Sequence, residues 1–339
     1  MKLELFDYDL PKSHIAQHPH EQRDHSKLLV VDKKIHTTKD RMFYDIIDEL
    51  NDNDVLIMNN TKVIPARLIG QKEDTHAVIE VLLLKEIEKN TWEALTKPAK
   101  KIKIGTIVSF GDGTLKLECI AIKDEGIRIF KAHYEGIFLE ILDLLGTIPL
   151  PPYITEKLED KDRYQTVYAK YAGSAAAPTA GLHFTKDLLD KIKAKGVQIL
   201  EITLHVGLGT FRPVQVDDVL DHQMHYESYE INEETAALLN QYKREHKRFI
   251  AVGTTTVRTL ESNYQNGFKA GNFTTNIFIY PGYQFKVVDA ILTNFHLPKS
   301  TLIMLISAFY DREIVLEIYR MAVKKNYRFF SFGDSMLIK

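Results

Sequence analysis

The sequence predicts an α/β protein made of a barrel-like main α/β domain and a smaller inserted β domain. After residue 196, apolar strand-like segments alternate with helical ones, a pattern typical of an α/β sheet or barrel covered by helices. Residues 68–147 instead hold short β-rich segments separated by turn signals such as Gly111-Asp112-Gly113, and prolines follow at 149, 151 and 152. We therefore expect a discontinuous main domain of residues 1–67 and 148–339. An antiparallel, barrel-like domain of residues 68–147 is inserted into it.

The individual elements follow from hydrophobic spacing. Main-domain strands are expected at Leu28–Val31, Asp54–Met58, Val197–Val206, Phe249–Val252 and Asn276–Tyr280. Helices are expected at Phe43–Leu50, Lys186–Ile192, Glu233–Lys243, Thr255–Tyr264, Ser300–Ala308 and Ile314–Lys324. The insertion is expected to hold strands at Val78–Leu84, Trp92–Leu95, Thr106–Phe110, Leu115–Ile122 and Ile127–Ala132, then a helix at Ile137–Leu145.

Composition narrows the class of protein. Of 339 residues, 45% are hydrophobic and 27% are charged, which is ordinary for a soluble globular chain. The single cysteine, Cys119, excludes an internal disulfide and a cysteine-rich metal site. We expect a cytoplasmic protein, because the sequence shows neither a signal peptide nor a run of about 20 apolar residues. The net charge of −2 argues weakly against a nucleic-acid partner, although a local basic surface would suffice for one.

Residues 162–185 form the stretch richest in potential chemistry. Small residues from Gly173 to Gly181 would let a ligand or another backbone approach closely, and Thr185 is a plausible N-cap for the following helix. Unpaired N–H groups at such a helix start favour ligand oxygens. The alternative is a tightly packed crossover loop without a ligand. The neighbouring aromatic residues, His183 and Arg163 favour a site.

Two further segments are placed where α/β folds bind ligands. The strand Asp54–Met58 delivers Asn59, Asn60 and Thr61 to its carboxyl end, although a turn is the favoured interpretation from these residues alone. The segment 253–258, Gly-Thr-Thr-Thr-Val-Arg, follows a strand and opens a helix, so it could hold a phosphate or carboxylate. It lacks the Gly-Lys-Ser/Thr of a P-loop, and Gly207-Leu208-Gly209 lacks the third glycine of a dinucleotide fingerprint.

The histidines do not form a recognised metal pattern. His222 and His225, with Asp221 and Glu227 nearby, could be drawn as a metal site, but their spacing fits neither a zinc protease nor a cysteine-containing site. Histidines that satisfy buried polar groups or stack on a base are the plainer account, and no Gly-x-Ser-x-Gly segment is present. We expect no metal.

The chain resembles the S-adenosylmethionine:tRNA ribosyltransferase-isomerases of queuosine biosynthesis. The resemblance rests on motifs spread over the whole chain, at residues 6–11, 59–67, 162–169, 173–185, 204–214, 253–262, 293–298 and 327–334. Leu208, where a smaller residue is usual, and Thr256, where serine is common, are mild departures from the family pattern. Since these motifs lie on both sides of residues 68–147, the resemblance supports an insertion there.

The resemblance implies a reaction. The ribosyl part of S-adenosylmethionine is transferred to 7-aminomethyl-7-deazaguanine at the wobble position of tRNA and isomerised, giving epoxyqueuosine-tRNA, while adenine and methionine leave. S-adenosylmethionine is then a co-substrate, with no true cofactor, and tRNA is the partner; no membrane or obligate protein partner is indicated. The reaction needs a base and a proton donor, for which His183 and His205 are the leading candidates, followed by Asp334 and Glu227.

Substrate contacts carried over from the motifs are expected from aromatic, glycine, threonine and polar residues, the aromatic faces suiting a sulfonium. They are Asn59, Thr61, Arg67, Arg163, Tyr164, Gln165, Tyr168, Thr179, Gly181, Phe184, Thr185, Gly207, Gly209, Thr210, Phe211, Gly253, Thr254, Thr255, Arg258, Asn294 and His296. Lys97, Lys100, Lys101 and Lys103 form the most cationic short run, which is either a solvated turn or an RNA contact.

The sequence is also compatible with two rival functions. A nucleoside or phosphoribosyl transferase acting on small molecules would use the glycine–threonine loops and need no RNA. A non-catalytic RNA-binding module would use the β insertion and its lysines and would bind RNA regardless of S-adenosylmethionine. The density of small, aromatic and histidine residues in the main domain disfavours the second rival.

Overall fold

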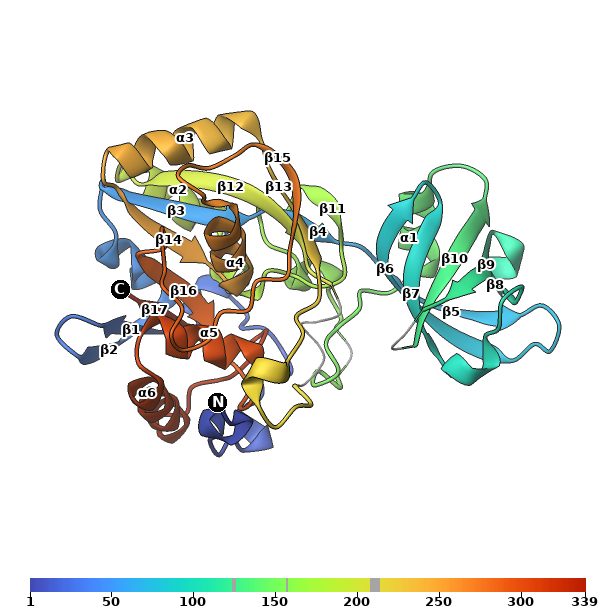
Figure 1. Ribbon diagram of the computed structural model, residues 1–339, viewed down its shortest axis with the longest axis horizontal. Helices are drawn as coiled ribbons and strands as arrows, with labels where there is room; N and C mark the ends of the chain where they lie inside the picture. Colours follow the sequence, from blue (N-terminus) through green and yellow to red (C-terminus); the bar gives the residue numbers. More distant parts are fainter. Residues whose placement is uncertain (124–125, 157, 208–213) are drawn as a thin grey trace. The chain divides into compact units, whose positions relative to one another are not determined.

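The computed structural model describes residues 1–123, 126–156, 158–207 and 214–339 (Figure 1). The chain divides into two compact units. The first contains Met1–Thr61, Pro152–Lys170 and Pro178–Lys339; the second contains Lys62–Pro151 and Tyr171–Ala177. Residues 68–147, the proposed insertion, lie wholly within the second unit, which takes in several flanking residues as well.

The first unit is built on a nine-stranded sheet. Its strands lie in the order β15 (Gly271–Thr275), β13 (Glu227–Ile231), β12 (Gln198–His205), β3 (Asp54–Asn59), β14 (Arg248–Val252), β16 (Ala290–Asn294), β17 (Ser335–Ile338), β1 (Lys27–Asp32) and β2 (Thr37–Met42). The four adjacent strands β12, β3, β14 and β16 are parallel to one another. Every residue of β3 is buried, so both faces of the central sheet are covered, as parallel sheets require.

Helices and loops cover this sheet. The α-helices of the unit are α2 (Lys186–Ala194), α3 (Glu233–Arg244), α4 (Thr254–Asn263), α5 (Thr301–Phe309) and α6 (Arg312–Lys324). One core cluster packs α2 and the 3₁₀ helix Phe43–Glu49 against alternate residues of the strands, such as Leu56, Met58 and Val252. Thr185 begins α2 as expected, because its Oγ1 accepts the N–H of Leu188 at 3.1 Å.

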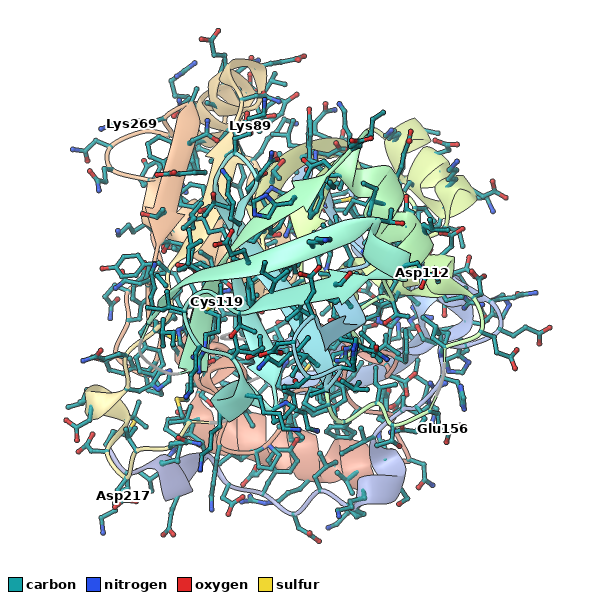
Figure 2. All side chains as sticks on the ribbon, turned by 90° about the vertical axis from the view of Figure 1, so that its right-hand side faces the viewer. Lys89, Asp112, Cys119, Glu156, Asp217 and Lys269 are labelled. Carbon is teal, nitrogen blue, oxygen red and sulfur yellow. The ribbon has the colours of Figure 1, made fainter. Side chains whose placement is uncertain are left out.

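The second unit is a closed six-stranded antiparallel barrel. Its order is β10 (Ile127–Tyr134), β7 (Thr91–Lys97), β6 (Val78–Glu88), β5 (Arg67–Lys72), β8 (Ile107–Phe110) and β9 (Leu115–Ile122), with α1 (Phe138–Leu145) packed on its core. Figure 2 labels Lys89, in the turn between β6 and β7, Asp112, between β8 and β9, and the buried Cys119. A separate two-stranded sheet joins β4 (Thr61–Val63) and β11 (Tyr171–Ser174).

The ends of the barrel segment are tied together. Arg67 and Thr147 exchange two backbone hydrogen bonds, with N···O distances of 3.1 and 2.9 Å. Gly146 precedes this bridge, and a Cβ atom there would lie 1.9 Å from the carbonyl oxygen of Pro65. The chain can therefore pass this point only with glycine, because two backbones meet there.

The α/β class and the small antiparallel barrel are confirmed, with three corrections of detail. The main sheet is open rather than barrel-like. Residues 276–280 are not a strand: the neighbouring strand β13 begins at Glu227, opposite Thr275, so no backbone partner extends beyond that point. The segment at Phe43 forms a 3₁₀ helix instead of an α-helix. In the described part of the chain, no helix is long and apolar enough to cross a membrane.

Candidate functional site

Four of the family-like motif segments of the first unit lie at one edge of its sheet. The parallel strands β12, β3, β14 and β16 end at His205, Asn59, Val252 and Asn294. Carboxyl ends of parallel strands share one edge, which is where open α/β sheets bind ligands. Segments 59–61, 205–207, 253–258 and 293–296 therefore come together there.

At this edge, Asn59 has a structural task. Its side-chain amide donates to the carbonyl of Leu204 at 2.9 Å and accepts the N–H of Leu204 at 3.0 Å. The amide thus continues the β3–β12 hydrogen-bond ladder by one more pair. Thr61, two residues on, places its Oγ1 2.8 Å from Nδ1 of the partly exposed His205.

The start of α4 lies beside the small-residue loop. Gly253 has φ of +87°, a conformation that favours glycine, and Ala180 lies 3.7 Å from the position of a Cβ atom there. Thr256 Oγ1 donates to Val252 O at 2.7 Å, whereas the buried Thr255 Oγ1 has no hydrogen-bond partner in the described structure. Helix α4 is thereby placed with its first turn at the carboxyl edge.

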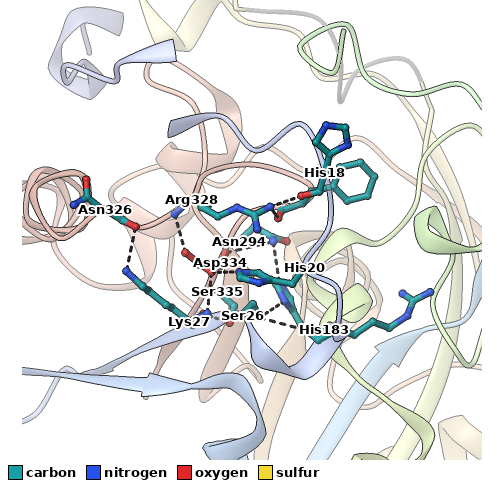
Figure 3. A network of polar contacts seen from close by, with 12 residues as sticks. His18, His20, Ser26, Lys27, His183, Asn294, Asn326, Arg328, Asp334 and Ser335 are labelled. Atoms are coloured by element: carbon teal, nitrogen blue, oxygen red, sulfur yellow. Dashed lines mark hydrogen bonds and ion pairs between the residues drawn. The ribbon is translucent and has the colours of Figure 1, made fainter. Parts of the chain in front are cut away.

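His183 is held through both ring nitrogens (Figure 3). Asn294 donates from Nδ2 to Nε2 at 3.1 Å, and Ser26 Oγ lies 2.7 Å from Nδ1, which carries the proton of the neutral ring. Phe43 stacks on the ring with centroids 4.9 Å apart, and Thr179 in turn donates to Oδ1 of Asn294 at 2.9 Å. Burial lowers the pKa of His183 from 6.5 to about 4, so the ring is neutral near pH 7.

Asp334 belongs to the same network and connects an N-terminal segment of the unit with a C-terminal one. One carboxylate oxygen accepts the backbone N–H of Lys27 at 2.8 Å and the other that of Arg328 at 2.7 Å. His20 lies within ion-pair distance at 3.7 Å. Burial alone would raise the pKa of Asp334, but the contacts with His20, the two amides and the Arg328 charge outweigh it and lower that pKa.

Two arginines line a small pocket next to His183, together with His20, Ser331 and Phe332. Arg23 donates to the carbonyls of Leu182 at 3.2 Å and Asp162 at 2.6 Å. Arg163 donates to the carbonyls of Glu21, at 3.1 Å, and His20. His20, Arg23 and Ser26 were not among the residues singled out from the sequence. The signal that could have found them is the density of histidine and arginine between residues 14 and 25.

A second pocket surrounds a buried ion pair between Glu227 and Arg258. Glu227 is the first residue of β13, and Arg258 lies in the second turn of α4. His222 and His225 line the same pocket, and burial followed by the nearby charge of His225 lowers the pKa of His222. Within the described ranges, no group of three or more metal-ligating side chains is close enough to hold an ion.

Comparison with known proteins gives one consistent answer. A family model described as "Queuosine biosynthesis protein" matches residues 3–338. The chain is 58% identical, over 100% of both sequences, to a Staphylococcus haemolyticus (strain JCSC1435) protein named S-adenosylmethionine:tRNA ribosyltransferase-isomerase. A similar solved structure is the crystal structure of the S-adenosylmethionine tRNA ribosyltransferase from Thermotoga maritima, with 38% sequence identity. The alignment covers 99% of this chain and 100% of the other, with a TM-score of 0.56.

The chain belongs to the queuosine biosynthesis protein family. Membership confirms the expected class, a transferase of this pathway. The family match spans residues 3–338, so the motifs before and after the barrel segment belong to a single match.

Several motif residues carried over from the family are packed inside the first unit. Phe184 is fully buried and meets Phe43 edge to face, with centroids 4.9 Å apart, so its ring lies in the core. Tyr164 is fully buried against Phe332. His296 is buried with Nε2 at 2.9 Å from Thr293 Oγ1, and burial lowers its pKa to about 3. These three side chains therefore belong to the packed interior of the unit.

Gly181 and its neighbours have tight packing of the same kind. A Cβ atom on Gly181 would lie 1.9 Å from the hydroxyl oxygen of Tyr168, so the tyrosine occupies the space a side chain would need. Thr185 caps α2 and donates to Asp24 at 3.3 Å. Gln165 ends the 3₁₀ helix Lys161–Tyr164.

The remaining family positions lie elsewhere. Arg67, expected in the main domain, instead begins strand β5 of the barrel unit and donates to Leu150 O at 3.2 Å. The four lysines also belong to the barrel unit and are all exposed. Gly209, Thr210 and Phe211 fall outside the described residues.

Proposed function

We propose that this protein transfers the ribosyl part of S-adenosylmethionine to 7-aminomethyl-7-deazaguanine at the wobble position of tRNA. The sugar is isomerised during transfer, so that epoxyqueuosine-tRNA forms and adenine and methionine are released. S-adenosylmethionine is consumed as a co-substrate. The observation that carries the proposal is the full-length likeness to a named S-adenosylmethionine:tRNA ribosyltransferase-isomerase.

The geometry supports a reaction site in the first unit. Four motif segments converge at the carboxyl edge of the parallel strands, and two of their residues, Arg258 and His205, each line a pocket. Proton removal from the sugar carbon beside the sulfonium and departure of adenine both need an enclosed site with fixed polar groups. We expect this edge to hold S-adenosylmethionine.

Among the four catalytic candidates, His205 is best suited to act as a base. Its ring is partly exposed, and it lines an open polar pocket on β12, β13 and β15 with Ser228 and Asn272 among others. His183 and Asp334 are committed to buried contacts inside the protein, and Glu227 is paired with Arg258. The hydroxyl of Thr61, 2.8 Å from Nδ1, orients the His205 ring.

The reaction itself tests the proposal. The protein is incubated with S-adenosylmethionine and tRNA carrying 7-aminomethyl-7-deazaguanine, and small molecules and RNA are followed by mass spectrometry. We expect adenine and methionine in equal amounts, with a matching gain of mass on the RNA. Methyl transfer with S-adenosylhomocysteine as product would reject the proposal. Adenine release at the same rate without RNA would favour a small-molecule transferase instead.

A further inference from the structure

The Glu227–Arg258 pair is unusual because both charges are buried at the wall of a pocket. The side chains are only 3% and 7% exposed. Taking two charges out of water is costly, and such a pair adds little stability compared with apolar packing. Its presence at a pocket wall therefore calls for an explanation other than folding.

Arg258 has unused hydrogen-bonding capacity. A guanidinium carries five N–H donors, and here Nη2 contacts the Glu227 carboxylate. The buried Nε has no hydrogen-bond partner in the described part of the chain. A buried donor without an acceptor is energetically unfavourable. A ligand that supplies an acceptor to this Nε–H group would therefore gain binding free energy.

The rest of the pocket sets the chemistry of that ligand. Glu227 presents a negative charge beside the arginine, and among the described residues its Oε1 receives only one long hydrogen bond, of 3.4 Å, from the N–H of Gly207. The surrounding wall is mostly apolar, formed by Met224, Ile277, Phe278, Leu302 and Leu305. A ligand that matches this wall carries a carboxylate and an ammonium group together on an apolar chain.

We infer that this pocket binds the amino-acid end of S-adenosylmethionine. The α-carboxylate is bound by Arg258, the α-ammonium lies against Glu227, and the methylene chain leading to the sulfonium packs on the apolar wall. A simple anion such as phosphate fits less well, because the Glu227 carboxylate would repel it. The inference rests on the proposed function and assigns Glu227 to substrate binding instead of proton transfer.

Decarboxylated S-adenosylmethionine, which lacks only the α-carboxylate, is the probe. Isothermal titration calorimetry on the full-length protein compares its Kd with that of S-adenosylmethionine. We expect the Kd of the wild-type protein to be at least about 30-fold higher for the decarboxylated compound, because the buried arginine would then lack its carboxylate partner. The double variant Glu227→Gln/Arg258→Met should bring this ratio to within about 3-fold.

Both charges are removed together because Arg258→Met alone would leave a buried, unpaired carboxylate. A second variant, Leu302→Trp, fills the pocket without altering the charges and should weaken binding of both compounds. The matched control is Asp54→Asn/Arg248→Met, which removes an ion pair of 2.6 Å at the amino ends of β3 and β14. This control should keep the wild-type ratio.

The outcomes separate the two proposals. A wild-type protein that fails to release adenine from S-adenosylmethionine and tRNA rejects the proposed function itself. A wild-type protein that releases adenine, but whose folded double variant keeps the 30-fold preference, overturns only the assignment of this pocket. Equal affinity of the wild-type protein for both compounds would overturn it as well.

Discussion

The ring of His183 has protein partners on every polar atom. Asn294 and Ser26 occupy its two nitrogens, and Phe43 covers one face. A histidine in this setting positions the loop 179–183 against the end of β16 and has no nitrogen left for a substrate proton. We therefore expect His183 to contribute to the stability of the fold and His205 to contribute to the rate of the reaction.

The lowered pKa of His183 predicts a specific dependence of stability on pH. The unfolded histidine takes up a proton below pH 6.5, whereas the folded one does so only near pH 4. The unfolded state thus binds more protons between these values, so stability is lost as the pH falls through this window. For one group the loss between pH 7.5 and pH 5 is about 2 kcal/mol.

The substitution His183→Gln removes this titration. Urea unfolding of the variant and the wild type at several pH values tests the prediction. The variant should be less stable at pH 7.5, and its deficit relative to wild type should shrink by about 2 kcal/mol at pH 5. His205→Gln provides the contrast: it should keep the unfolding curve and lower the single-turnover rate by about 100-fold. A deficit of His183→Gln that is the same at every pH, or a 100-fold slower folded His183→Gln protein, would contradict these assignments.

The end of β7 and the turn that follows it carry four exposed lysines, on a backbone that receives hydrogen bonds from Arg128. Arg128 donates to the carbonyls of Ala99 at 3.1 Å and Ile102 at 3.3 Å, and Ile102 is buried. This backbone is fixed while Lys97, Lys100, Lys101 and Lys103 remain exposed. Among the described residues, no carboxylate lies within ion-pair distance of these four amines, so their charges are available to a polyanion.

We predict that these four lysines contact tRNA phosphates. Replacing all four with glutamine should weaken tRNA binding and flatten the slope of log affinity against log salt by roughly 0.7 to 0.9 for each phosphate that is no longer neutralised. Fluorescence titration of labelled tRNA between low and moderate salt measures the slope. Lys186, Lys191 and Lys193 of α2, changed to glutamine, are the control and should leave it unaltered. An unchanged slope in the quadruple variant would place the RNA surface elsewhere.

The barrel has a hydrophobic core of its own, and the two ends of its chain segment lie close together. Its interior contains Leu68, Val81, Trp92 and Phe130 among others, without residues of the large sheet. The bridge between Arg67 and Thr147 brings the two ends of the segment into hydrogen-bonding contact. Removing everything between them would therefore require only a tight turn.

We predict that the first unit folds without the barrel. In the variant, an Asn-Gly turn replaces residues 68–146, because this dipeptide suits a two-residue connection between antiparallel strands. The shortened protein should retain a cooperative unfolding transition and bind S-adenosylmethionine with similar affinity. Its salt slope in tRNA binding should be flattened by the same amount as in the quadruple lysine variant. A folded product that no longer binds S-adenosylmethionine would show that the barrel contributes to that site.

Local pattern was sufficient for many elements of this fold. Alternation and apolar runs identified β1, β3, β12 and β14, and the small polar residue before Lys186 identified the start of α2. The same patterns missed β2, because all its residues are at least partly exposed, and misjudged 276–280, because a strand also needs a partner. A propensity for extended backbone is local, whereas pairing depends on where the next strand ends.

The sequence by itself determined the α/β class, the β-rich insertion and, through motifs along the chain, the family. The tertiary structure alone decided what the motif side chains do. Asp334 bonds to Lys27 across 307 positions of sequence, and Asn294 reaches His183 across 111. Such contacts depend on strand order and register in the sheet, which no local spacing encodes. For this reason the sequence could name His183, Glu227 and Arg258, but only the fold separates a buried neutral ring from a charged pair at a pocket wall.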